Sequence, residues 1–275
     1  MLDWNDTRFG FLPFDLFAIE KWDYTTPASE AESKRQWEIL AWQYQRLTLF
    51  ERWSYYKPLV GVVPPAPASQ ELSERILGSN QTTQERKISE SHSCRGHIAP
   101  LWLRTCYDPT MATRYGELEW AANPQDFLED RVLDNEALYA FPDGPDSWRR
   151  VLVRMPAFTE FLGACPMDGD GANFQYHSGL DDDEILQQIE AIPDERSREI
   201  SRISRRVQAV LYLVDREAIS AGVIKVLWLD EHGEAVWDNR IQPDGLEELT
   251  LQVQDAIRFD EIVDRDGNRG DLLLI

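Results

Sequence analysis

Residues 207–229 decide the fold: they read VQAVLYLV at 207–214, DREAISA at 215–221 and GVIKVLWL at 222–229. The first and third segments are almost continuously apolar, which is typical of central strands covered on both faces. We predict that these two strands lie side by side in one sheet and point in the same direction. An aspartate follows each of them, Asp215 after the first and Asp230 after the second.

More strands and helices are expected around this pair. The segment APLWLRTCY, residues 99–107, predicts another strand, and Asp108 follows it as a helix N-cap. In the helix that Asp108 begins, three apolar residues share one face: Met111, Tyr115 and Leu118. A final strand is expected in DLLLI at the end of the chain. We therefore predict an α/β domain over residues 99–275, with a mixed, largely parallel sheet and flanking helices.

The first part of the chain has a different character. A helix is predicted from about Pro27 to Tyr56, apolar on two sides and rich in tryptophan. We interpret residues 1–60 as a Trp-rich helical N-terminal extension. Residues 61–98 contain a proline-rich stretch and then a polar one, which predicts a mobile connector. The predicted helix supplies three candidate partner-binding residues, Trp37, Trp42 and Trp53.

The charge of the chain restricts its partners. The formal net charge is -21 for 275 residues. A surface this acidic repels phosphate backbones and anionic lipids, so direct contact with nucleic acid or membrane is not expected. No apolar run approaches the roughly 20 residues that cross a bilayer. Three cysteines, an odd number, predict reduced thiols and a cytoplasmic location.

Acidic residues at strand ends form the main candidate for chemistry. If the predicted strands are parallel, Asp108, Asp215 and Asp230 gather at one edge of the sheet, with Arg104 nearby. Ligands of open α/β sheets bind outside the carboxyl ends of the strands. Clustered carboxylates could hold a hard cation or act as an acid and a base. The alternative is that each aspartate only caps the turn or helix that follows.

A basic stripe is expected on the helix that precedes residue 207. Arg198, Arg202 and Arg206 lie four residues apart, which places them on one face of a helix. This stripe could bind a phosphate or an acidic partner. The alternative is a solvated face on which the arginines pair with neighbouring acids such as Asp194.

No cofactor or metal site is predicted. Asp264, Asp266 and Asn268 begin with the spacing of a calcium loop. The sixth position of that loop is Arg269, where the motif needs glycine, and the twelfth is Ile275 instead of glutamate. Asp266, Gly267 and Asn268 therefore predict a turn before the last strand.

Four segments carry a resemblance to a family. They are LRTCYDP (103–109), LYLVDREA (211–218), KVLWLDEHG (225–233) and FDEIVDRDGNRGD (259–271). They resemble an uncharacterised family of small bacterial-type domains of unknown function, in patches over residues 99–275. Such domains carry an Arg-Thr pair after an early strand and finish on an Asp-Gly turn and an Arg-Gly pair. The resemblance implies a fold and no activity.

These patterns leave three functional hypotheses. The first is an acidic binding or regulatory protein that selects a basic protein partner by charge. The second is a metal-dependent or small-molecule enzyme that uses the carboxylates at the strand ends. The third is a protein that associates with itself through the N-terminal helix.

Overall fold

The structure is a computed structural model that describes residues 9–25, 29–56, 70–94, 98–142, 144, 146–160, 187–255, 257–266 and 269–273. The chain forms two compact units, and each contains two separate segments of the sequence. The first unit comprises Met1–Gly96 and Arg150–Ser178, and the second comprises His97–Arg149 and Gly179–Ile275. The helices of residues 13–56 are therefore part of a larger unit and not an extension by themselves.

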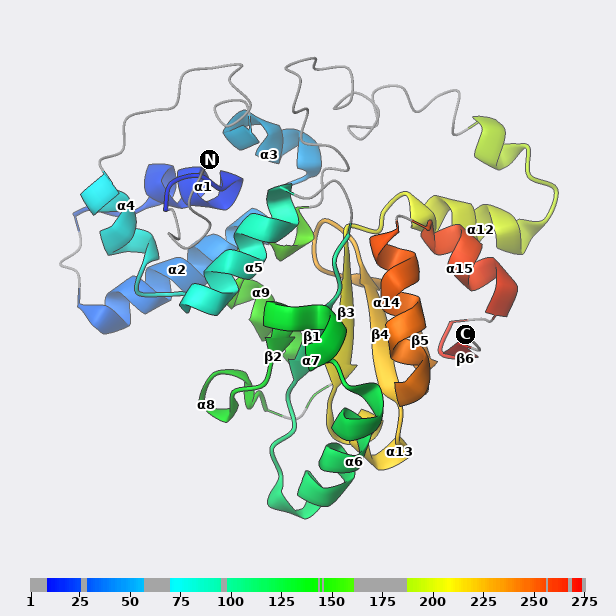
Figure 1. The fold of residues 1–275 in the computed structure, drawn as a ribbon. Coiled ribbons are helices and arrows are strands. Elements are labelled where there is room, and N and C mark those ends of the chain that lie inside the picture. The colour runs from blue at the N-terminus through cyan, green and yellow to red at the C-terminus, as the bar shows by residue number, and fades with distance from the viewer. Residues whose placement is uncertain are drawn as a thin grey trace. The chain divides into compact units, whose positions relative to one another are not determined.

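Six described strands form one sheet in the second unit (Figure 1). In chain order they are β1 Leu101–Arg104, β2 Val132–Leu133, β3 Ala209–Val214, β4 Ile224–Leu229, β5 Ala235–Ile241 and β6 Leu272–Leu273. Their order in the sheet is β2-β1-β3-β4-β5-β6. The pairs β1–β2, β1–β3 and β5–β6 are parallel, and β3–β4 and β4–β5 are antiparallel. The predicted mixed sheet of an α/β fold is confirmed.

The predicted parallel pairing of β3 with β4 is wrong. Val210 lies opposite Trp228 and Tyr212 opposite Val226, and the two strands run antiparallel. Only Asp215–Val223 connect them, including the short helix α13, Arg216–Ala221. A parallel crossover needs a dozen or more residues, so this connection is long enough only to reverse the chain.

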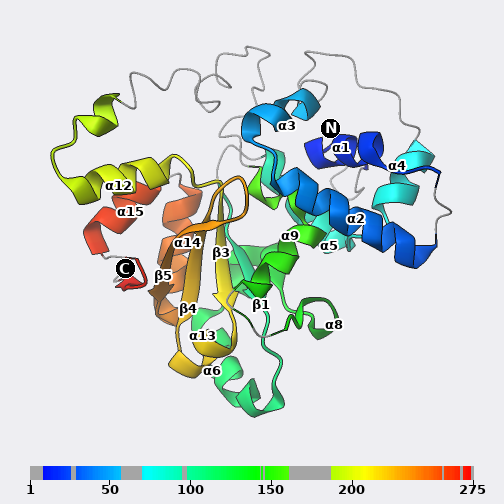
Figure 2. The same ribbon diagram turned by 180° about the vertical axis from the view of Figure 1, so that it is seen from behind.

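Helices cover the sheet of the second unit. The described helices of this unit are η1 Pro109–Met111, α6 Ala112–Ala122, α7 Gln125–Leu128, η2 Glu129–Arg131, α8 Glu136–Tyr139, η3 Ser147–Arg150 (whose last residue belongs to the first unit), α12 Glu195–Ser204, α13, η5 Pro243–Gly245, α14 Leu246–Gln254 and α15 Phe259–Asp266, and several of them pack on the sheet. All residues of β3 are buried, as its apolar run predicts. One face of the sheet packs Trp102, Tyr212 and Trp228 against α14 and α15. Figures 1 and 2 show α14 on this face, in front of the strands in one view and behind them in the other.

The first unit is helical in its described residues. Its helices are α1 Pro13–Lys21, α2 Glu30–Gln45, α3 Leu49–Tyr56, α4 Gln70–Leu77, α5 Thr83–Cys94, α9 Val151–Arg154 and η4 Pro156–Thr159. Phe14 of α1 makes edge contacts with Trp37 and Tyr44 of α2, with ring centroids 5.0 and 5.3 Å apart. These aromatic residues belong to the buried core of the unit, together with aliphatic residues such as Leu40 and Leu77.

Two sequence-based expectations for this unit need correction. Residues 27–56 are not one helix, because α2 ends at Gln45 and α3 begins at Leu49. The described part of the predicted connector, residues 61–98, is mostly helical, since α4 and α5 occupy most of 70–94. Residues 61–69 and 95–97 of the predicted connector lie outside the described residues, as does the turn predicted at Gly267 and Asn268.

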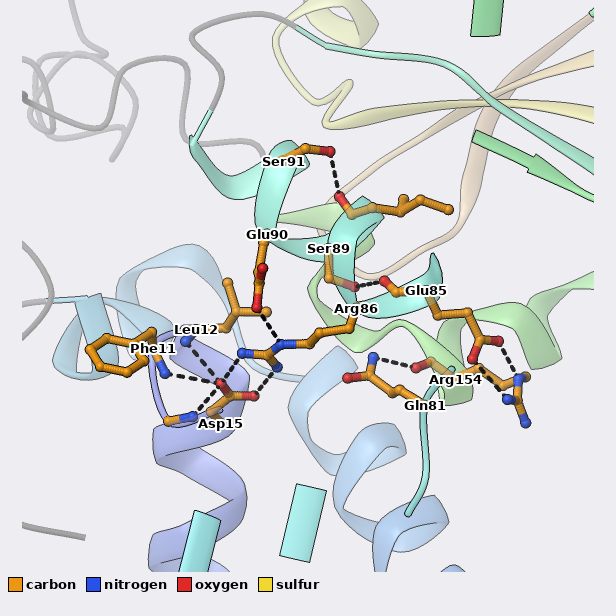
Figure 3. A network of polar contacts seen from close by, with 12 residues as sticks. Phe11, Leu12, Asp15, Gln81, Glu85, Arg86, Ser89, Glu90, Ser91 and Arg154 are labelled. Carbon is orange, nitrogen blue, oxygen red and sulfur yellow. Dashed lines mark hydrogen bonds and ion pairs between the residues drawn. The ribbon is translucent and has the colours of Figure 1, made fainter. Parts of the chain in front are cut away.

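Buried ion pairs cross-link the helices of the first unit (Figure 3). Arg86 of α5 donates two hydrogen bonds to Asp15 of α1, at 2.7 and 2.6 Å, and a third to Glu90 at 2.8 Å. Both Asp15 and Arg86 are almost completely buried. In the same helix, Glu85 binds Arg154 of α9. Burial alone would lower the pKa of Arg86, but the Asp15 and Glu90 carboxylates outweigh it and raise that pKa.

Candidate functional site

The edge at which the parallel strands end is the candidate site. Because β1, β2 and β3 are parallel, the residues that follow them lie at one edge of the sheet. Asp134 follows β2, Arg104 ends β1 and Asp215 follows β3. In the strand order, the chain goes from β1 to β2 on one side and from β3 to β4 on the other. α/β folds commonly bind ligands where the strand order diverges in this way. In both ribbon views, α6 and α13 lie at this end of the strands.

The predicted gathering of three aspartates is wrong. Asp230 follows β4, which runs antiparallel to β3, so it lies at the opposite edge of the sheet. Its Oδ1 accepts backbone hydrogen bonds from His232 and Glu234, at 3.0 and 2.9 Å. Its Oδ2 binds Arg206 at 2.6 Å. Asp230 is fully buried and closes the turn between β4 and β5.

Asp108 and Asp215 share the candidate edge, and each caps a helix. Asp108 Oδ1 accepts the backbone N–H of Thr110 at 2.8 Å, and Asp215 Oδ1 accepts that of Ala218 at 2.8 Å. The second oxygen of Asp108 binds Arg216 at 2.8 Å. The bonds from Thr110 and then the ion pair with Arg216 lower the pKa of Asp108.

Lys225 connects Asp215 to a second acid at the same edge. Its Nζ binds Asp215 Oδ2 at 2.7 Å and Glu217 Oε2 at 2.6 Å. Arg240, at the end of β5, binds the other oxygen of Glu217 at 2.8 Å. Burial lowers the pKa of Lys225, but its bonds to the two carboxylates outweigh burial and raise that pKa overall. The bond from Lys225 lowers the pKa of Glu217.

Arg104 lies between two aromatic rings. Its guanidinium carbon is 4.4 Å from the ring centre of Tyr107 and 3.6 Å from that of Tyr115. Its Nη1 donates to both oxygens of Asp134 at 3.3 Å, and its Nε donates to the Cys106 carbonyl at 2.9 Å. The Tyr115 hydroxyl donates to Asp134 Oδ2 at 2.7 Å. Burial, and then Asp134, raise the pKa values of Tyr107 and Tyr115, so both hydroxyls stay protonated.

This cluster fixes α6 against the sheet. Tyr115, Leu118 and Ala122 form the buried side of the helix. The opposite side is exposed and contains Thr113, Gly116, Glu117 and Trp120, which we call the α6 face. The Trp120 side chain is 85% exposed, and a Cβ added at Gly116 would meet nothing within 4 Å.

Asp134→Ala is expected to lower the free energy of unfolding by roughly 2 kcal/mol, because it removes the charged acceptor of Arg104 and of Tyr115. Glu117→Gln, on the exposed side of α6, is the control. It should change the free energy of unfolding by less than about 0.5 kcal/mol. Denaturant unfolding of both variants measures the difference. Equal midpoints for the two variants would show that Asp134 does not hold α6.

The three tryptophans predicted to bind a partner differ in how deeply they are buried. Trp37 is buried in the core of the first unit, and its Nε1 donates to the Val153 carbonyl at 2.6 Å. Trp42 and Trp53 are half-buried, and Trp53 stacks on Tyr56 with ring centroids 6.3 Å apart. The most exposed tryptophan among the described residues is instead Trp120.

The three arginines of the predicted stripe bind separate partners. Arg198 donates to the Ile192 carbonyl at 3.2 Å, and Arg202 forms an ion pair with Glu190. Arg206 binds Asp230. The three side chains therefore each have a separate contact within the second unit.

Searches for a metal site, a membrane span and a similar protein give no further indication of a function. Within the described ranges, no group of three or more histidine, cysteine, aspartate or glutamate residues is placed to hold a metal ion. In the same residues, no helix combines the length and apolar composition that crossing a bilayer requires. Comparison of the chain with protein-family models, curated proteins and solved structures finds no match in any of the three.

Proposed function

We propose that this chain is an acidic binding or regulatory protein that acts through contacts with a basic protein partner. The main observation behind the proposal is that the carboxylates at the candidate edge form ion pairs with basic side chains of the fold. Asp134 binds Arg104, Asp108 binds Arg216, and Asp215 binds Lys225. The acids that the enzyme hypothesis needs therefore connect elements of the fold.

The pKa shifts at this edge support the same proposal. A general acid near neutral pH needs a carboxyl whose pKa is raised. At the candidate edge, the pKa values of Asp108 and Glu217 are lowered. These two groups remain ionised in their ion pairs, as expected for structural contacts.

The charge of the chain supports a basic partner. The net charge of -21 accelerates the encounter with a positively charged protein and slows the encounter with a negatively charged one. Two copies of this chain repel each other for the same reason. Trp37 and Leu40, which self-association through α2 would use, are already buried in their own unit. A different, basic protein is therefore the partner that we propose.

The test is recovery of the partner with the full chain. The chain is tagged and expressed in its source cells, complexes are cross-linked, and a recovered protein is purified for calorimetry. We expect a basic protein in stoichiometric amount, whose affinity weakens about tenfold or more as salt rises from low to physiological concentration. No recovered protein, an acidic partner, or an affinity insensitive to salt would contradict the proposal.

A further inference from the structure

We propose that the α6 face is the surface that binds the basic partner, and that it receives a lysine- or arginine-rich segment passing over Gly116. This inference rests on the proposed function and identifies the site and the chemistry of the contact. It is drawn from three properties of the α6 face: an exposed tryptophan, an unexplained glycine and an acid.

Trp120 provides the apolar part of the contact. Its side chain is 85% exposed, more than any other large hydrophobic side chain among the described residues. Tryptophan is the residue most enriched at the energetic centres of protein interfaces, where it buries a large area with little loss of conformational freedom. A single exposed apolar residue is normal on a protein surface, so Trp120 alone does not identify a site.

Gly116 is the second observation. It lies in the middle of α6, four residues before Trp120 and on the same side. Glycine is among the poorest helix formers and costs about 1 kcal/mol relative to alanine inside a helix. A Cβ at Gly116 would meet nothing within 4 Å, and its φ is not positive. The fold of the described residues therefore does not require glycine at this position. A partner segment that approaches the helix backbone closely would require it, because any side chain there would be in the way.

Glu117 determines the charge of the segment that fits. It is exposed on the α6 face, one turn before Trp120. A lysine or arginine placed there would pair with the Glu117 carboxylate and lie over the indole ring of Trp120. An acidic segment would be repelled by Glu117 and by the charge of the whole chain.

The α6 face is ordered before a partner binds. Tyr115 and Leu118 are buried on the other side of the helix, and the hydroxyl of Tyr115 is bonded to Asp134. A partner therefore meets a helix whose backbone is already held in place, which reduces the entropy lost on association.

Photo-cross-linking tests the site. A photoreactive amino acid replaces Thr113 in one full-length sample and Leu251 in another, and each is irradiated in the source cells. Leu251 is the matched control because it is 46% exposed on α14 of the same unit. Mass spectrometry then identifies the cross-linked peptide. We expect position 113 to join a lysine- or arginine-rich segment of another protein, and position 251 to give no such product.

Variants of the α6 face extend the test. Trp120→Ala and Glu117→Lys should each reduce the cross-link yield about tenfold. Gly116→Ala should also reduce the yield while raising Tm by about 2 °C, because alanine favours the helix. Arg114→Ala is the control, since Arg114 lies about 120° around the helix from Trp120. It should not lower the yield, because it removes a positive charge and leaves Trp120, Gly116 and Glu117 in place.

Each other outcome has a defined meaning. A cross-link from position 113 to a second copy of this chain, or to an acidic or apolar segment, overturns the inference. So does a product from position 251 alone, or unchanged yield in Trp120→Ala. In those cases the proposed function stands if the tagged chain still recovers a basic partner. Recovery of no partner by any route contradicts both proposals.

Discussion

Asp15→Ala is expected to destabilise the first unit by roughly 3–5 kcal/mol, the loss typical of breaking a buried ion pair from one side. Asp15 and Arg86 are each about 1% exposed, so the substitution leaves a buried guanidinium without its main counter-ion. Asp15 Oδ2 also accepts the backbone N–H groups of Gly10, Phe11 and Leu12, at 2.8, 3.0 and 3.1 Å. These three donors lose their acceptor together with Arg86.

An exposed ion pair of the same unit provides the control. Lys34 and Glu30 of α2 lie 2.9 Å apart, and both side chains are mostly exposed. Lys34→Ala should change the free energy of unfolding by less than about 0.5 kcal/mol. Denaturant unfolding, with hydrogen exchange of the α1 and α5 amides to report on this unit, measures both variants. Similar exchange rates in the two would contradict a stabilising role for the buried pair.

Glu160 gives the second large effect, a dependence of stability on pH. Its side chain is fully buried, and burial raises its pKa from 4.5 to about 7, although nearby Arg52 opposes the shift. Tyr44 and Tyr56 also face it and oppose the shift, whereas the charge of Asp15 adds to it. Between pH 4.5 and 7 the native state therefore holds a proton that the unfolded state has lost.

The sign of the effect follows from that proton. Stability contributed by Glu160 is greatest below about pH 4.5, falls as pH rises to about 7, and is constant above that. The total loss is about 3 kcal/mol, from about 1.4 kcal/mol for each pKa unit. Glu160→Gln stays neutral at every pH, so it should be more stable than the parent chain at about pH 8 and lose this advantage at about pH 4.5. Unfolding midpoints of both proteins across this range check the prediction, and parallel pH profiles would contradict it.

The central strands could be located from the sequence, but the direction predicted for the second of them was wrong. The apolar runs at 207–214 and 222–229 became β3 and β4, since continuous burial selects continuous apolar residues. The connection Asp215–Val223 is visible in the sequence and too short for a parallel crossover. That length limit requires an antiparallel pair, and an antiparallel pair places Asp215 and Asp230 at opposite edges of the sheet.

Helix starts were also recoverable from local signals. Thr48 and Glu51 form a capping box, in which the Thr48 N–H reaches Glu51 Oε2 at 2.8 Å and the Glu51 N–H reaches Thr48 Oγ1 at 3.2 Å. Thr82 and Glu85 repeat this arrangement at the start of α5. Both pairs have the Thr-x-x-Glu spacing that marks a helix N-terminus. They explain why a second helix follows α2 and why polar residues 83–94 are helical.

The candidate site was only partly predictable. Arg104, Asp108 and Asp215 were predicted at one edge, and they share it because β1 and β3 are parallel. Asp134 was missed, since β2 contains only two residues and gives no apolar pattern. Trp120 could have been found, because it lies away from the helix side marked by Met111, Tyr115 and Leu118. Nothing local in the sequence shows that Arg104 lies between two tyrosine rings.

The two-segment composition of the first unit has a consequence for protein synthesis. Trp37 and Gln45 of α2 donate to the carbonyl groups of Val153 and Pro156, more than one hundred residues later in the chain. Proteins leave the ribosome from the N-terminus, so these donors emerge long before their acceptors are translated. β1 and β2 are also released before the early helices find their last partners. The nascent chain must therefore carry incomplete α1 and α2 packing through much of its elongation, a period in which chaperones would find exposed aromatic side chains.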